Sequence, residues 1–199
     1  MAENIREPQQ KRSIDKKNRI IEAGYKLFAE KGYFDTNTAE IAKEAGVSTG
    51  IIYGYFHDKK DILIEVLDIY IDKIFNPVFE MFNGITKPVN FGKIIPHVID
   101  MAVRIHLNNS GIHNALHALS NTDSDVKEKF LFLEEKITSS LTENLTKNAY
   151  SPNDLKERIH LSMEIIQSYA HERVFDNHPY IDYDKMHAII TDMIMQIFK

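Results

Sequence analysis

Apolar side chains recur at intervals of three and four residues along most of the chain, which is the spacing of amphipathic helices. Short stretches rich in glycine, proline, asparagine and serine separate these segments. No stretch keeps the alternation with period two that is typical of half-buried strands. We therefore predict an all-α protein. The expected helices span residues 14–31, 58–75, 93–108, 112–120, 123–148, 152–176 and 182–198, and two short helices lie between the first and second of these.

The two short helices are separated by a tight turn. Asn37 is a good N-cap, and the carboxylate of Glu40, three residues later, can close a capping box. Gly46 can adopt the left-handed conformation that ends the helix, and Ser48 is expected to cap the next one. This arrangement is a helix-turn-helix, whose second helix is free to enter the major groove of DNA.

Capping residues and prolines also mark the boundaries of other predicted helices. Asp58 is expected to cap the helix over 58–75, and Asn76-Pro77 should kink or end it, because proline lacks an N–H and restricts the residue before it. Ser151 is the predicted N-cap of the helix over 152–176, with Pro152 at its first position. Residues 1–13 are polar and charged and are predicted to form a mobile basic arm.

Hydroxyl and ammonium groups gather at the ends of the predicted helix-turn-helix helices, where such donors can hold DNA phosphates. They belong to Thr38, Tyr53, Tyr55 and Lys59. Gly50 and Gly54 each cost the second helix roughly 1 kcal/mol of helix propensity, which a close approach to a groove wall would justify. The alternative interpretation is a compact three-helix corner that binds no DNA.

Residues 19–63 resemble the DNA-binding domain of the tetracycline-repressor-like (TetR) family. The resemblance has no gap and rests on many positions at fixed spacing. They are Arg19-Ile20-Ile21-Glu22-Ala23-Gly24, Leu27-Phe28, Lys31-Gly32-Tyr33, Ile41-Ala42, Ala45-Gly46-Val47-Ser48, Gly50, Tyr53, Tyr55-Phe56, Lys59 and Leu63. It implies an N-terminal three-helix helix-turn-helix domain, residues 1–57, followed by a C-terminal helical ligand-binding and dimerisation bundle, residues 58–199.

The positions expected to face bases lie at the leading ends of the two helices of the motif: Ala39, Ser48, Thr49 and Gly50. None of them is Arg, Asn or Gln, the side chains that make bidentate contacts with bases. Readout of the sequence is therefore expected to rest on thymine methyl groups, backbone approach, the arm and DNA shape.

The last helix is apolar nearly all round, whereas a terminal helix on a monomer would bury one face. The helix over 152–176 offers a similar surface. We predict that both helices, from each of two subunits, form a four-helix dimer interface, as the family also implies. The expected contact residues are Met163, Ile166, Tyr169, Ala170, Ile190, Met193, Ile194 and Ile197. The alternative is that the last helix is a central core element.

In the TetR family a cavity among the middle helices binds a small effector. The middle of this chain is rich in methionine and aromatic side chains, which suit an apolar or aromatic ligand, and histidine or tyrosine could supply polar contacts. The candidate effector-binding residues are Phe82, His97, Met101, His117, Phe130 and Tyr169. For any one of them, ordinary core packing is the competing explanation.

Composition narrows the functional classes. The chain has 199 residues, a net charge of −5 and no cysteine, which excludes disulfides and thiolate metal sites. Residues 1–60 carry 11 Lys and Arg against 9 Asp and Glu, so the positive excess lies with the helix-turn-helix and the acidic excess elsewhere. No membrane span or secretion signal is expected, and we predict a cytoplasmic protein.

Nine histidines raise the possibility of a metal-dependent enzyme. Glu157 and His160 form one Glu-x-x-His pair, and His187 lies in a looser echo of it, whereas a di-iron bundle needs two such motifs and two further glutamates. We therefore expect no metal, no cofactor and no catalytic site. The sequence predicts a homodimeric transcriptional regulator, a repressor that a small effector releases from a near-palindromic DNA operator. A protein–protein adaptor that has lost DNA binding is the other alternative.

Overall fold

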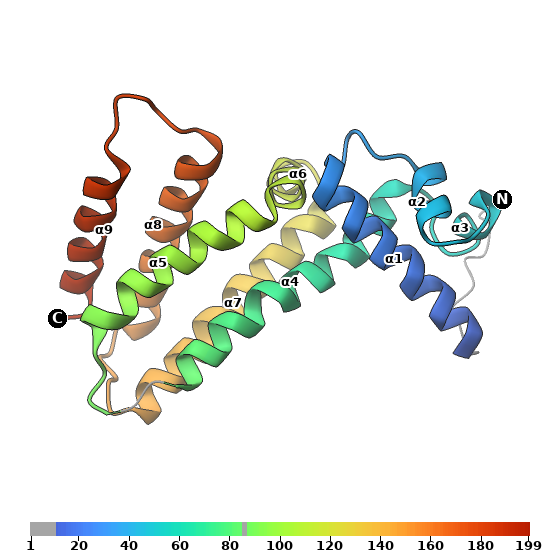
Figure 1. The fold of residues 1–199 in the computed structure, drawn as a ribbon. Coiled ribbons are helices and arrows are strands. Elements are labelled where there is room, and N and C mark those ends of the chain that lie inside the picture. Colours follow the sequence, from blue (N-terminus) through green and yellow to red (C-terminus); the bar gives the residue numbers. More distant parts are fainter. Residues whose placement is uncertain (1–10, 85–86) are drawn as a thin grey trace. The chain divides into compact units, whose positions relative to one another are not determined.

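The structure, a computed structural model, describes residues 11–84 and 87–199. Every regular element in that part of the chain is an α-helix, which confirms the all-α prediction (Figure 1). The helices are α1 (Lys11–Lys31), α2 (Thr38–Glu44), α3 (Thr49–Ile52), α4 (Lys59–Asn83), α5 (Phe91–Asn108), α6 (Ser110–Ser120), α7 (Ser124–Lys147), α8 (Leu155–Phe175) and α9 (Tyr183–Ile197).

The predicted start and end of α2 and the predicted cap of α4 are confirmed. The N–H of Glu40 donates to Asn37 Oδ1 at 3.0 Å, and the N–H of Asn37 donates to Glu40 Oε2 at 3.2 Å, so the capping box is closed. Gly32 and Gly46 follow α1 and α2 with φ of +85° and +65°, a conformation that side chains disfavour. Asp58 caps α4 by accepting from the N–H groups of Lys60 and Asp61.

Two predicted boundaries are wrong. α4 continues through Pro77 to Asn83. Its last turns bury Phe82 in a core with Leu141 and Leu145 of α7, and burial of such side chains, at about 1.5–3 kcal/mol each, offsets the roughly 3 kcal/mol that an internal proline costs. α8 begins after Asp154 rather than at Pro152.

The start of α1 also differs from the prediction. The helix begins at Lys11, so the last residues of the predicted arm over 1–13 are helical. Residues 1–10, which include the basic Arg6, lie outside the described part of the chain.

The helices pack as two compact units. One contains the described residues up to Asp72 together with Asn109–Lys129, and the other contains Lys73–Asn108 and Phe130–Lys199. This division does not coincide with the predicted one between residues 57 and 58, because the start of α4 and the whole of α6 pack on α1. Gly24 of α1 lies against Ile62, and Gly111 of α6 lies against the backbone of Phe28. The division at 57/58 stays a proposal about function.

In the second unit, α5 packs against both α8 and α9, which also contact each other (Figure 1). The buried side chains at this junction are Ile95, Ile99, Ile166, Tyr169, Ile190 and Ile194. No helix within the described residues has the length and the apolar character that crossing a membrane requires.

Candidate nucleic-acid interface and effector site

The turn between α2 and α3 is held by backbone hydrogen bonds and by a small apolar core. The N–H of Val47 donates to the carbonyl of Ala42 at 2.9 Å, and that of Gly46 donates to Lys43 at 3.2 Å. Ile41 of α2 and Ile52 of α3 are fully buried. This leaves the opposite sides of both helices facing outward, as the helix-turn-helix interpretation requires.

The four positions expected to face bases lie on that outer side. Ala39, Ser48 and Gly50 are exposed, and Thr49 is half-buried. Ser48 has the backbone conformation of an N-cap, but its side chain makes no capping hydrogen bond, contrary to the prediction. The space above Gly50 is open, since a Cβ built there meets nothing closer than Ser48 Oγ at 4.0 Å. Packing inside the subunit therefore does not explain a glycine at this helical position.

Two of the predicted phosphate-binding residues are tied to neighbouring helices. The hydroxyl of Tyr53, whose side chain is half exposed, lies 3.2 Å from Thr38 Oγ1 and links α3 to α2. The Tyr55 hydroxyl lies 2.7 Å from Ser13 Oγ on α1. Each hydroxyl has further hydrogen-bonding capacity, so the phosphate role predicted for these residues stays a proposal.

Lys59 has a different environment from the one expected. Its ammonium donates to the carbonyl oxygens of Tyr33 at 2.6 Å, Thr36 at 2.7 Å and Phe34 at 3.4 Å, and it lies 4.2 Å from the centre of the Tyr33 ring. Burial lowers the pKa of this ammonium. Lys59 therefore ties the loop between α1 and α2 to the start of α4, and the phosphate role predicted for it stays a prediction.

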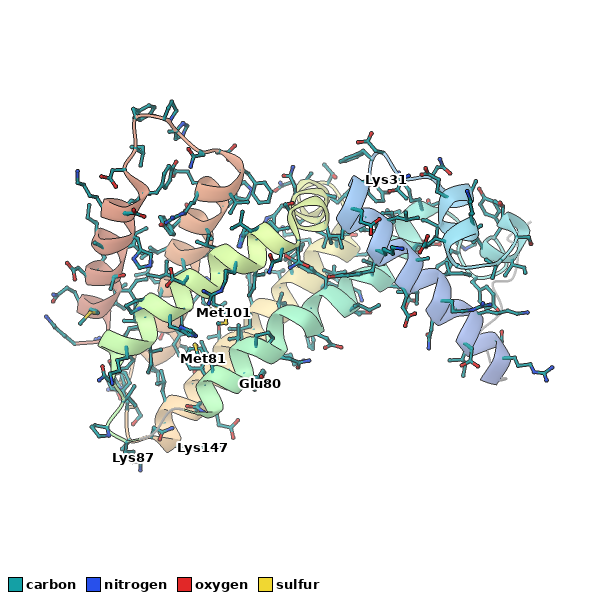
Figure 2. The ribbon with its side chains drawn as sticks, in the orientation of Figure 1. Lys31, Glu80, Met81, Lys87, Met101 and Lys147 are labelled. Atoms are coloured by element: carbon teal, nitrogen blue, oxygen red, sulfur yellow. The ribbon has the colours of Figure 1, made fainter. Side chains whose placement is uncertain are left out.

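The six predicted effector-binding residues are not brought together. Phe82, Met101 and Tyr169 are buried, Phe130 and His117 are half-buried, and His97 is exposed. His117 belongs to the first unit, where its ring lies 4.2 Å from that of His113, and the others belong to the second. In Figure 2, Met101 is labelled on α5 and Met81 on α4.

Of these six residues, only Phe82 lines the hollow that the second unit contains between α4 and α7. Its lining is Val78, Phe79, Phe82, Ile137, Ser140, Leu141 and Asn144. The hollow holds about 20 Å³, which is room for about one water molecule. Sequence reasoning missed Ser140 and Asn144, although their spacing of four residues within the apolar face of α7 would have indicated two polar groups on one side.

The predicted dimer interface needs correction. Ile166, Tyr169, Ala170, Ile190 and Ile194 are buried inside the subunit, and Met163 and Ile197 are partly buried. Tyr169 donates to the carbonyl of Tyr183 at 3.1 Å and accepts from Arg173 at 2.5 Å. Only Met193 is half exposed, together with Leu161 of α8 and Ile189 of α9. The outward surface of the two helices is thus made by residues other than most of those expected.

The three residues considered for a metal-dependent enzyme do not form a metal site in the part of the chain that the structure describes. Glu157 and His160 point from exposed positions of α8, whereas His187 of α9 is half-buried and lies 3.4 Å from Asp100 of α5. Among the described residues, no three His, Asp or Glu side chains are grouped so that they could hold a metal ion.

The chain is similar in sequence to known regulatory proteins. Residues 20–66 match the family model described as bacterial regulatory proteins, tetR family. The transcriptional regulator HbdR from Aromatoleum sp. is 44% identical over 75 residues, which are 38% of this chain and 33% of that protein. The alignment thus spans only a third of the relative's length.

Solved structures resemble the chain over nearly its whole length. A tetR-family transcriptional regulator from Mesorhizobium loti has a TM-score of 0.71 and 18% identity, over 94% of this chain and 97% of that one. A transcriptional regulator from Saccharomonospora viridis, in complex with choline, has a TM-score of 0.67 and 18% identity, over 90% and 95%. At this level of identity the likeness shows a shared fold.

Proposed function

We propose, from the match of residues 20–66 to the family model of bacterial regulatory proteins, tetR family, and from the likeness to HbdR, that this protein is a TetR-type DNA-binding transcription regulator that acts as a repressor. The observation that supports this best is the outward face of α3. Gly50 costs the helix roughly 1 kcal/mol and faces open space in the subunit. Contact with a groove wall of DNA would explain a glycine at this position, since only a residue without a side chain lets the backbone approach closely.

Most of the residues predicted to contact DNA are retained in this proposal. Thr38, Tyr53 and Tyr55 donate to phosphates, and Ala39, Ser48, Thr49 and Gly50 face bases in the major groove. Lys59 instead acts by holding the loop that precedes α2. Binding to chromosomal DNA places the protein in the cytoplasm.

The regulator is proposed to bind as a homodimer through α8 and α9, with Leu161, Ile189 and Met193 at the centre of the contact. Three exposed large apolar side chains on one helix pair favour burial against a second copy. A two-fold dimer would present its two copies of α3 one helical turn of DNA apart, about 34–36 Å, or a multiple of it. The operator is therefore expected to be near-palindromic.

An apolar or aromatic effector is proposed to release the DNA. The hollow beside Phe82 supports this chemistry, because its lining is apolar except for Ser140 and Asn144 and contains no charged side chain. Since the hollow now has room for about one water, the effector would have to spread α4 from α7. α4 also contributes to the first unit, so a shift of this helix can change the fit to DNA, with a coupling of about 1–3 kcal/mol.

A mobility-shift experiment with the DNA upstream of the protein's own gene tests the proposal. We expect a shifted band for the full chain and none for Gly50→Trp, a variant whose fold should survive because the space at Gly50 is open. A protein–protein adaptor would give no shift with either. A ligand screen by thermal shift, with shifted DNA as the second readout, then tests effector release, because a ligand of the folded state raises its stability.

A further inference from the structure

Many cations of the helix-turn-helix unit already have partners within it. Among its described residues, five lysines form ion pairs with carboxylates, one of them Lys129 with Asp68, and Lys59 donates to backbone carbonyls. The other four pairs, at 2.6–2.7 Å, are Lys17 with Glu65, Lys26 with Glu44, Lys31 with Glu40, and Lys60 with Asp123. The attraction of these side chains to a phosphate is reduced by the carboxylates beside them.

A smaller group of cations stays available. Among the described residues of this unit, Arg12, Lys16 and Arg19 of α1 are exposed and make no ion pair. Their spacing of four and three residues places them on one face of the helix, and we call them the α1 stripe. Lys43 of α2 is also exposed and unpaired, one turn after the predicted base-facing Ala39.

The α1 stripe lies beside the turn of the helix-turn-helix. Arg19 Nη1 lies only 3.7 Å from the place where a Cβ on Gly46 would be. Toward the start of α1, Ser13 Oγ lies 2.7 Å from the Tyr55 hydroxyl. The half of α1 that carries the stripe thus lies near the residues that precede and follow α3. Asp15 lies on the same face within the stripe and Glu22 follows it by one turn, but neither forms an ion pair with its three cations.

We propose that the α1 stripe binds the phosphate backbone of duplex DNA next to the groove that α3 enters. This inference rests on the proposed DNA-binding function and adds to it the residues that supply its electrostatic attraction. Arginine is suited to this role because its planar guanidinium can donate two hydrogen bonds to one phosphate. A net charge of −5 makes such a local cluster necessary, since the protein as a whole repels DNA.

The dependence of affinity on salt concentration tests the proposal directly. The variant Arg12→Gln/Lys16→Gln/Arg19→Gln is compared with Lys93→Gln/Arg104→Gln/Lys156→Gln, which removes three exposed cations from the second unit and the same total charge. The probe is a labelled duplex of mixed sequence, about three helical turns long, followed by fluorescence anisotropy. Phosphate contacts are independent of sequence, so the operator need not be known. Arg12→Lys/Arg19→Lys keeps the charge and controls for folding, together with circular dichroism.

Each phosphate contact contributes about 0.9 to the slope of log affinity against log salt concentration. For a dimer we expect the stripe variant to lose about 5 from the magnitude of the slope, whereas the second-unit variant and the lysine variant keep that of the parent. A stripe variant with the parent's slope would overturn the inference and leave DNA binding intact. A parent protein that binds no duplex at low salt would instead overturn the proposed function, and the inference with it.

Discussion

The ammonium of Lys59, at the first position of α4, lies 2.7 Å from the carbonyl oxygen of Thr36, directly before α2. Thr36 is itself buried, and its hydroxyl donates to the carbonyl of Gly32 at 2.8 Å. The loop that leads into the helix-turn-helix is therefore tied to both α1 and α4. We propose that Lys59 acts on DNA binding through the position of α2, by holding this loop.

Replacing Lys59 with methionine should lower the free energy of unfolding by about 1–3 kcal/mol, because half-buried carbonyl oxygens lose their donor. DNA affinity should fall as well, with the salt slope unchanged. Chemical denaturation and anisotropy titrations measure the two effects. Lys43→Met, at an exposed unpaired lysine, is the control for stability. Unchanged stability with a slope smaller by about 0.9 per subunit would return Lys59 to the phosphate-binding role.

The N-caps of α2 and α3 form a matched pair. Asn37→Ala removes a side chain that accepts from the N–H of Glu40 at 3.0 Å and should cost about 1 kcal/mol of unfolding free energy. Ser48→Ala removes a side chain that makes no capping bond and should cost much less. Denaturant titration of both variants decides the matter, and equal losses would contradict the geometry described for Ser48.

The helix-turn-helix was predictable because its signals are local. The capping box of Asn37 and Glu40 and the left-handed Gly46 depend on residues within one turn of one another. The continuation of α4 through Pro77 was not predictable in this way. It depends on packing of Phe82 against side chains more than fifty positions away in the sequence, and tertiary packing overrides local propensity there.

Gly111 marks the closest approach of α6 to α1. A Cβ at this position would lie 2.6 Å from the carbonyl oxygen of Phe28 and 3.2 Å from that of Ala29, both backbone atoms that cannot turn aside. Gly111→Ala should therefore force α6 away from α1 and lower the unfolding free energy by about 1–3 kcal/mol. Ser110→Ala, at the exposed neighbouring position, is the control. A melting temperature equal to that of the control would show that α6 does not pack as described.

The dimer proposal predicts that a charge on the outer face of α9 separates the subunits. Ile189→Glu and Met193→Glu should each shift the protein from dimer to monomer, because each side chain is half exposed in the subunit and would be buried in the dimer. Phe132→Glu makes a similar change at a 61% exposed position of α7 and should leave the dimer intact. Sedimentation velocity distinguishes the species, and a monomeric parent protein would contradict the proposal outright.

Most of the residues that the sequence assigned to this proposed surface pack inside the subunit instead. α8 and α9 are apolar nearly all round, so the spacing of their side chains does not tell which face meets α5 and which is left outward. Tyr169 illustrates the difficulty, since it was a candidate for both the effector site and the dimer interface. It is 1% exposed, with its hydroxyl bonded to Arg173 and Tyr183.

Selection of duplexes from a random-sequence pool by the purified full chain, followed by sequencing, tests the central claim most directly. A dimer that presents two copies of α3 should enrich a near-palindromic sequence whose half-sites are centred about 10–10.5 base pairs apart or a multiple of that spacing. Enrichment of no sequence, or of a single half-site without a symmetric mate, would contradict the account.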